Sequence, residues 1–195
     1  MSKIILASQS PRRKMLLEWA CVNFEVVVVE TDEEYPVTLP AQEVPEFIAG
    51  NKAIAVKEKL HAENALFNET CIIAADTIVL LGNVILGKPV DRAHAIETLQ
   101  MLSGKTHQVI TGVQIWYQEK QYHFREITEV CFHQLSLEQI QFYVDEFKPY
   151  DKAGAYGIQD WIGVVGIKEI KGDFYNVMGL PVSTLLQKIK QLGII

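Results

Sequence analysis

Near its N-terminus the chain reads Leu6-Ala7-Ser8-Gln9-Ser10-Pro11-Arg12-Arg13, an apolar run that breaks on hydroxyl residues and continues as a helix. Ser10 is a typical N-cap and Pro11 a typical first helical residue, so the sequence predicts a helix that begins at Pro11. Such a start presents free backbone N–H groups, and Arg12 and Arg13 add positive charge there against the helix dipole. We expect a bound anion to offset this repulsion, most simply a phosphate chain held by the helix start, the serine hydroxyls of Ser8 and Ser10, and the guanidinium groups. The alternative is two solvated arginines lying over the first turn.

The length of 195 residues fits a single domain over residues 1–195, with room for two lobes and a full core. No apolar run reaches the ~20 residues that span a bilayer, and no signal peptide precedes the first strand, so we expect a soluble cytoplasmic protein without a membrane partner. The net charge of −6 argues against nucleic-acid binding. A bound polyphosphate would therefore need a local basic cluster and a divalent cation. Cys21, Cys71 and Cys131 lie far apart in apolar segments, and we expect buried thiols.

The pattern of apolar residues predicts an α/β chain. Strands are expected at residues 3–8, 24–29, 70–81, 84–86, 106–117, 122–133 and 164–170. Helices are expected at residues 11–20, 44–61, 92–102, 137–148 and from 181 onward, with Met15, Leu16 and Trp19 facing inward in the first. Hairpin turns are expected at residues 82–83 and 119–120. Residues 151–159 are too small and glycine-rich to form a core strand.

Asp76 is the most unusual residue of the apolar strand at residues 71–81. An unpaired carboxylate there would be costly, so it needs a metal ion, a lysine or several hydrogen-bond donors. A purely structural aspartate bonded to backbone amides is the alternative. Glu33 follows the second strand, where open α/β sheets bind ligands, although a solvated loop acid is the more common outcome. Together with Asp76 it could form the oxygen ligands that Mg²⁺ or Mn²⁺ prefers.

Two lysines could contribute positive charge to such a site. Lys52 lies in the middle of a predicted helix, and Lys88 is displayed by a Gly-Lys-Pro turn, although most lysines are simply solvated. The histidines show no HxxxH or HExxH spacing, so zinc is not expected, and no serine lies in a GxSxG motif. The chain also lacks GxxxxGK[ST] and GxGxxG loops. An anion site, a carboxylate and lysines suit metal-assisted attack of water on a phosphoanhydride.

Seven short motifs follow one another in the order of a known family. They are Leu6-Ala7-Ser8-Gln9-Ser10-Pro11-Arg12-Arg13, Asn51-Lys52-Ala53, Ala75-Asp76-Thr77, Gly87-Lys88-Pro89, Leu102-Ser103-Gly104 with Thr106-His107, Lys152-Ala153-Gly154-Ala155-Tyr156-Gly157-Ile158-Gln159, and Asn176-Val177-Met178-Gly179-Leu180-Pro181. Each motif alone is weak evidence, but all of them in order are specific. The sequence resembles the Maf family of nucleoside triphosphate pyrophosphatases over nearly its whole length.

The resemblance implies an elongated α/β fold like that of the inosine-triphosphate pyrophosphatases, with a mixed sheet, flanking helices and two lobes around a deep cleft. It also implies hydrolysis of a nucleoside triphosphate to the monophosphate and diphosphate in the cytoplasm, with a divalent cation, Mg²⁺ or Mn²⁺. A phosphatase that releases orthophosphate and a non-catalytic, nucleotide-responsive protein in cell-division control are the alternatives. A homodimer is the default expectation for a soluble enzyme.

The resemblance also implies roles for individual residues. Asp76 matches the base that activates water, and Glu33 matches a metal ligand beside it, with the assignment among Asp32, Glu33 and Glu34 uncertain by one residue. Positions that match phosphate-binding residues are Arg13, Lys52 and Lys88. Positions that match residues for substrate choice are Arg12, Thr77 and Gln159.

The motif that ends in Gln159 resembles the branch of the family that prefers dTTP and UTP, whereas a branch that prefers 7-methyl-GTP has glutamate there. The chemistry of the side chain agrees with this preference. A glutamine amide offers both a donor and an acceptor, which match the N3–H and carbonyl of a pyrimidine, whereas a carboxylate only accepts. The alternative is a loop glutamine that bonds to nearby backbone.

Overall fold

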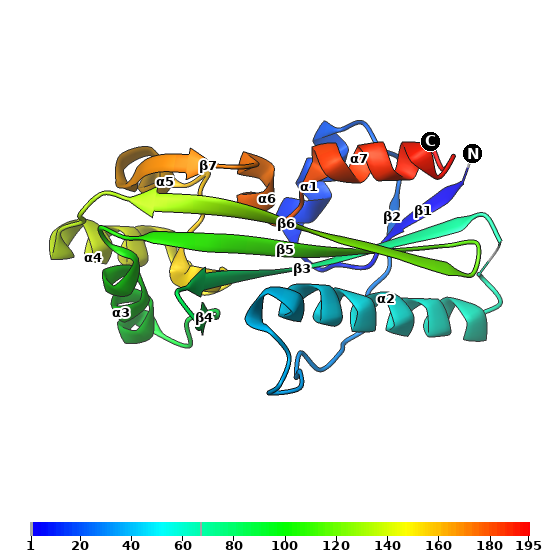
Figure 1. Cartoon of the computed structure of the whole chain (residues 1–195), viewed down its shortest axis with the longest axis horizontal. Helices are drawn as coiled ribbons and strands as arrows, with labels where there is room; N and C mark the ends of the chain where they lie inside the picture. The colour runs from blue at the N-terminus through cyan, green and yellow to red at the C-terminus, as the bar shows by residue number, and fades with distance from the viewer. Residues whose placement is uncertain (1, 67) are drawn as a thin grey trace. The chain divides into compact units, whose positions relative to one another are not determined.

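The computed structural model shown in Figure 1 describes residues 2–66 and 68–195. Within these residues the fold is mixed α/β, with a seven-stranded sheet in the order β2-β1-β3-β5-β6-β7 and β4 paired with β3. The strands are β1 Lys3–Leu6, β2 Glu25–Val26, β3 Thr70–Leu81, β4 Val84–Leu86, β5 Thr106–Tyr117, β6 Lys120–Phe132 and β7 Ile167–Lys171. The helices are α1 Pro11–Trp19, η1 Ala41–Glu43, α2 Val44–Ala62, α3 Arg92–Leu102, α4 Leu137–Phe147, η2 Ala153–Ala155, α5 Trp161–Gly166, α6 Phe174–Met178 and α7 Val182–Gln191. The predicted α/β class is confirmed.

The chain divides into two compact units. Unit 1 comprises Met1–Asp76, Thr111–Glu126 and Gly179–Ile195, and unit 2 comprises Thr77–Ile110 and Ile127–Met178. That residues 1–195 act as a single domain stays a prediction. Across the described ranges, no helix combines the length and apolar character needed to cross a membrane.

Parallel strands form the centre of unit 1. β1 pairs with β2 on one side and with β3 on the other, so that Leu6 lies between Val26 and Ile73. In Figure 1, α2 runs along one face of these strands, and α1 and α7 cover the opposite face. A continuous core forms where β1 and β3 meet α2, from Ile5, Ala7, Ala53, Val56, Leu60, Ile72 and Ala74. This layering brings the middle of α2 against the strand that carries Asp76.

Four expectations were wrong in detail. The second strand extends only over Glu25–Val26, because the chain then leaves the sheet as an irregular acidic loop. Trp19 is 61% exposed, since α1 buries a face made of Arg13, Leu16 and Leu17. Cys21 is exposed just beyond α1, while Cys71 is buried and Cys131 is half-buried. The β5–β6 turn uses residues 118–119, one position earlier than expected, and both adopt positive φ.

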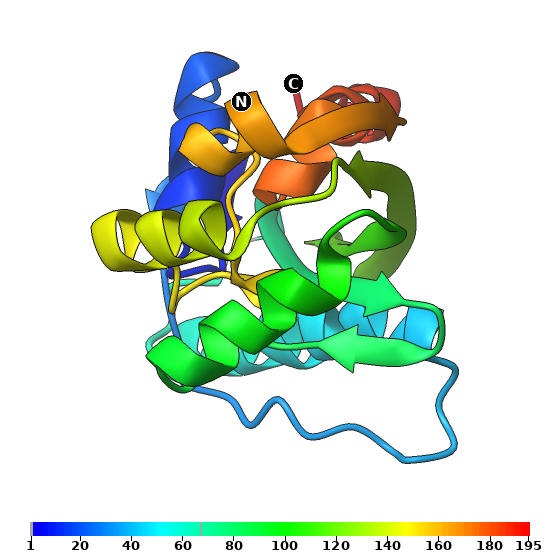
Figure 2. The ribbon, with the colours of Figure 1, turned by 90° about the vertical axis from the view of Figure 1, so that its left-hand side faces the viewer.

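Unit 2 contains the β3–β4 hairpin and the antiparallel pair β6–β7. Figure 2 looks onto α3 and α4, which pack together, and Arg92 binds Asp145 through two hydrogen bonds of 2.6 and 2.8 Å across this contact. The predicted strand at residues 164–170 was wrong in its first half, because residues 164–166 complete α5 and β7 begins at Ile167. α6 was not predicted.

Candidate active site

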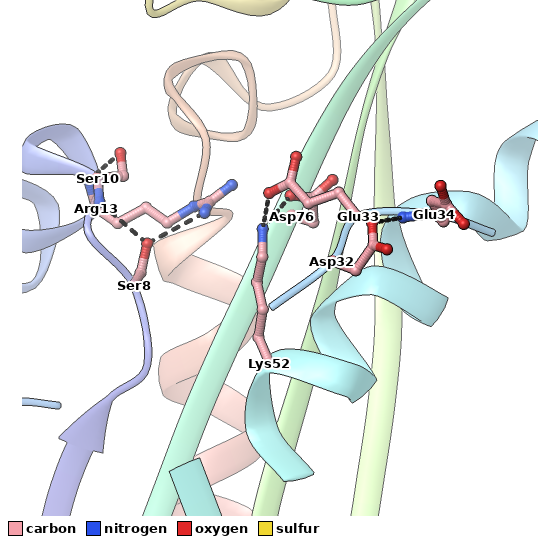
Figure 3. Close-up of polar contacts among 8 residues, drawn as sticks. All are labelled: Ser8, Ser10, Arg13, Asp32, Glu33, Glu34, Lys52 and Asp76. Atoms are coloured by element: carbon pink, nitrogen blue, oxygen red, sulfur yellow. Dashed lines mark hydrogen bonds and ion pairs between the residues drawn. The ribbon is translucent and has the colours of Figure 1, made fainter. Parts of the chain in front are cut away.

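The start of α1 has the predicted capping geometry. Ser10 is the N-cap, its hydroxyl accepts a bond of 3.5 Å from the backbone N–H of Arg13, and Pro11 opens the helix. The Ser8 hydroxyl accepts from the Ser10 N–H at 3.2 Å and from Arg13 Nη1, also at 3.2 Å. The two serines predicted at this helix start therefore shape the turn from β1 into α1, and both bind Arg13, Ser10 at its backbone N–H and Ser8 at its guanidinium (Figure 3).

The Arg13 guanidinium is buried and held on two sides. Besides the bond to Ser8, Nε donates to the Gly179 carbonyl at 2.7 Å. Burial lowers the pKa of Arg13, as does Arg12, while Asp76 and Glu33 act in the opposite direction. An arginine stays protonated at neutral pH even so. The helix start thus contains a fixed, buried positive charge that is coupled electrostatically to the Asp76 carboxylate.

Lys52 joins two carboxylates from different parts of unit 1. Its Nζ lies 2.7 Å from Asp76 Oδ1 on β3 and 2.6 Å from Glu33 Oε1 in the acidic loop. The side chains of Lys52 and Asp76 are 18% and 13% exposed, whereas Glu33 is 51% exposed. Figure 3 shows the Lys52 side chain extending from α2 toward both carboxylates. From the sequence, the partner of Asp76 could be a metal ion, a lysine or several hydrogen-bond donors. In the structure Asp76 is paired with a lysine, Lys52.

The structure distinguishes Glu33 from the two acids beside it. Asp32 Oδ1 accepts a bond of 2.9 Å from the backbone N–H of Glu34, so Asp32 stabilises the local turn. In Figure 3 the Glu33 carboxylate is directed at Lys52, while the Glu34 side chain points away from it. Of the three neighbouring acids, Glu33 is the one brought to Asp76.

The donor set of this cluster suits a hard divalent cation that is shared with a substrate. Glu33 and Asp76 already direct carboxylate oxygens at the same ammonium group. Within the described residues no group of three or more His, Cys, Asp or Glu side chains forms a metal cage. Mg²⁺ is commonly held by one or two carboxylates together with waters and substrate phosphates, so two acids are sufficient. The arrangement does not suit zinc, which prefers three or four nitrogen and sulfur ligands.

Unit 2 contains Thr77, Lys88 and Gln159. Thr77 follows Asp76 on β3 and is half-buried, and Lys88 and Gln159 are exposed. The Gly-Lys-Pro turn around Lys88 is held by a bond of 3.1 Å from the Gly154 N–H to the Gly87 carbonyl. This bond links the turn that displays Lys88 to the segment that leads to Gln159.

That segment is buried without forming a strand. Gly154 has a φ of +69°, and a Cβ on it would approach Val79 to 2.9 Å, so only glycine fits there. Tyr156 is buried, and its Oη lies 2.7 Å from His107 Nε2. Burial lowers the pKa of His107 to about 4, so the imidazole that meets Tyr156 is neutral at pH 7. The prediction that residues 151–159 form no core strand is confirmed, since the segment instead contains η2.

A family model described as Maf-like protein matches residues 3–192. The chain belongs to the Maf-like protein family. Among curated members of the Maf family, proteins named dTTP/UTP pyrophosphatase match closely. The Cytophaga hutchinsonii protein is 50% identical, over 97% of this chain and 84% of its own length. The Phocaeicola vulgatus protein is 49% identical over 97% of this chain and 96% of its own length. The Porphyromonas gingivalis protein is 45% identical over 98% of this chain and 94% of its own length.

The predicted family is thereby confirmed. Among solved structures, the Ham1 protein of Staphylococcus aureus aligns with a TM-score of 0.48 and 12% sequence identity. The alignment covers 67% of this chain and 71% of that protein, and the similarity is too weak to support a conclusion.

Sequence reasoning missed the contact between Arg13 and Gly179. The motif around Gly179 was recognised, but nothing in it indicates which side chain its carbonyl accepts from. A weak signal existed, because the helix start at Pro11 and the Gly179-Leu180-Pro181 segment both contain residues that restrict the backbone. Only the tertiary structure brings them together.

Proposed function

We propose that this chain is a nucleoside triphosphate pyrophosphatase that hydrolyses dTTP and UTP, or modified pyrimidine triphosphates, to the monophosphate and diphosphate. The observation that carries the proposal is the cluster in which Lys52 binds both Asp76 and Glu33 next to the buried Arg13. Relatives at 45–50% identity that are named dTTP/UTP pyrophosphatase support the choice of substrate.

In this proposal the positive groups of unit 1 bind the triphosphate. The helix start at Ser10 supplies backbone N–H groups, and Arg12, Arg13 and Lys52 supply charge. Arg13 is already held by Ser8 and Gly179, so its guanidinium loses little conformational entropy when an anion binds. By resemblance to the family, Lys88 binds the same phosphates, and Arg12, Thr77 and Gln159 select the base.

Asp76 is proposed to orient the attacking water and to accept its proton. The water oxygen forms a bond to the α-phosphorus, the bond from that phosphorus to the bridging oxygen breaks, and diphosphate leaves with the electron pair. Lys52 balances the charge of Asp76 before the reaction and stabilises the developing charge on the leaving group. A Mg²⁺ or Mn²⁺ ion held by Glu33 and Asp76 would polarise the α-phosphate. The proposal places the protein in the cytoplasm, where its substrates are.

Glu33→Gln is expected to lower kcat/KM by about 10- to 100-fold, because a glutamine amide keeps the shape but not the charge that pairs with Lys52. The neighbouring variants Asp32→Asn and Glu34→Gln serve as matched controls, since neither carboxylate is directed at Lys52. They should retain activity within about threefold of the wild type. Steady-state diphosphate release measures all three. If Asp32→Asn were the most damaged variant, the assignment of Glu33 would be wrong.

The proposed activity is tested with the full chain and a panel of normal and modified triphosphates, with and without Mg²⁺ or Mn²⁺. Diphosphate and orthophosphate are assayed separately. We expect one diphosphate per monophosphate, with dTTP and UTP as the preferred substrates. Release of orthophosphate would identify a phosphatase instead. No turnover with any triphosphate would favour the non-catalytic role in cell-division control.

A further inference from the structure

One tyrosine hydroxyl holds both ends of the turn that contains Gln159. The turn is closed by a bond of 3.0 Å from the Asp160 N–H to the Gly157 carbonyl, so Ile158 and Gln159 are its two central residues. The Oη atom of Tyr143, on α4, accepts from the Gly157 N–H at 3.0 Å. The same hydroxyl donates to Asp160 Oδ2 at 2.8 Å.

The Tyr143 side chain is itself held rigidly. It is fully buried, and its ring stacks on Phe147 with the centroids 5.1 Å apart. A hydroxyl has one proton, so donation to Asp160 leaves the oxygen lone pairs for the Gly157 N–H. Burial, followed by the hydrogen bond to Asp160, raises the pKa of Tyr143 far above its ordinary value, and the hydroxyl therefore keeps this proton.

Two glycines allow the turn to lie this close to its neighbours. A Cβ on Gly163 of α5 would lie 1.8 Å from the Ile158 carbonyl oxygen, so α5 packs directly on the backbone before Gln159. A Cβ on Gly157 would lie 2.5 Å from Asp160 Oδ2 and 3.0 Å from Gln159 Nε2. The Gln159 side chain therefore starts from a backbone that is fixed from two sides, although it is itself exposed.

We propose that Tyr143 is a positioning residue for base selection, and that its hydroxyl fixes the Gly157–Asp160 turn so that Gln159 presents its amide in one orientation. The proposal rests on the proposed function, in which Gln159 contacts the base. An amide distinguishes bases by where its donor and its acceptor lie, so rotation of the turn would weaken the distinction. Tyr143 itself need not touch the substrate.

Tyr143→Phe removes the hydroxyl and keeps the ring stacked on Phe147. We expect kcat/KM for dTTP and UTP to fall about tenfold, while slow hydrolysis of purine triphosphates stays unchanged, so that selectivity falls about tenfold. Asp160→Ala removes the other partner of the hydroxyl and should lower selectivity in the same direction. Tyr117→Phe is the matched control, because it removes the hydroxyl of a buried tyrosine that bonds to Ser2 and Gln118 instead.

The role is separated from a general structural effect by a double variant and by amide exchange. In a Gln159→Ala background, Tyr143→Phe should cause no further loss of selectivity. Hydrogen exchange at the Gly157 N–H should become faster in Tyr143→Phe and stay unchanged in Tyr117→Phe, a readout that needs no activity.

Three results would overturn the role of Tyr143: an unchanged selectivity in Tyr143→Phe, an equal loss in the Gln159→Ala background, or an unchanged exchange rate at Gly157. A wild-type protein that hydrolysed all triphosphates equally would instead overturn the proposed substrate choice, and base selection by this turn with it. The substrate selectivity of the wild-type protein therefore shows whether the proposed substrate choice has failed or only the role of Tyr143.

Discussion

Asp76→Asn is expected to lower kcat/KM for diphosphate release by about 10³-fold. Asparagine has the shape of aspartate, and its amide oxygen can still accept the hydrogen bond from Lys52, so the local geometry should persist. The variant loses the negative charge and the group that accepts a proton from water. Steady-state kinetics with dTTP, together with circular dichroism and thermal unfolding, would separate lost chemistry from lost folding.

Asp145→Asn is the matched control for this substitution. Asp145 makes an exposed ion pair with Arg92 on the contact between α3 and α4, so the same chemical change is made outside the proposed site. Its activity should equal that of the wild type. If Asp76→Asn retained turnover within about threefold of Asp145→Asn, Asp76 would have no part in proton transfer.

Gly112→Ala is expected to lower the free energy of unfolding by about 3 kcal/mol. Gly112 is buried on β5, and a Cβ there would lie 2.3 Å from the Glu46 nitrogen and 2.5 Å from the Pro45 carbonyl carbon. Both are backbone atoms at the start of α2, so no side chain can rotate away to make room. The helix that contains Lys52 would have to shift from the sheet. Urea unfolding monitored by circular dichroism measures the change.

Gly50→Ala tests the same substitution on the helix side. Gly50 lies within α2, and among the described residues a Cβ there would meet only Gln114 Oε1, at 4.0 Å. Alanine is the better helix former by about 1 kcal/mol, so this variant should be as stable as the wild type or more stable. Equal stability of Gly112→Ala and Gly50→Ala would contradict the close packing of α2 on β5.

Helix starts were predictable because they depend on neighbouring residues. Ser10, Asp91 and Ser136 all cap the helices that follow them, through bonds to backbone N–H groups three residues ahead. The inward face of α1 was not predictable in this way. We expected Trp19 to face inward with Met15 and Leu16, but burial of Arg13 turns the face toward Leu16 and away from Trp19.

The segment from α5 into β7 shows the same competition between local preference and packing. Val164 and Val165 have β-branched side chains, which favour a strand, yet they lie in α5. In this helix Gly163 packs against the Ile158 carbonyl oxygen, which would lie 1.8 Å from a Cβ at that position. Tertiary packing therefore overrides the local preference, and the strand begins only at Ile167.

The candidate site was predictable in part. An aspartate in the apolar strand β3 had to have a partner, and that need can be derived from charge burial alone. The partner's identity could not be derived, because a lysine in the middle of a helix is usually solvated. Lys52 reaches Asp76 because α2 packs over β1 and β3, and this contact is a property of the whole unit.

The β5–β6 turn leaves room for protein engineering. Gln118 and Glu119 have φ angles of +48° and +60°, which glycine and asparagine adopt with less strain than other residues. An Asn-Gly pair at these positions would remove strain of roughly 1 kcal/mol per residue. It would also remove the ion pair between Lys57 and the exposed Glu119, whose atoms lie 3.5 Å apart and which contributes about 0.5 kcal/mol. A more heat-resistant form of the protein could thus be made at a loop that contains none of the proposed catalytic groups.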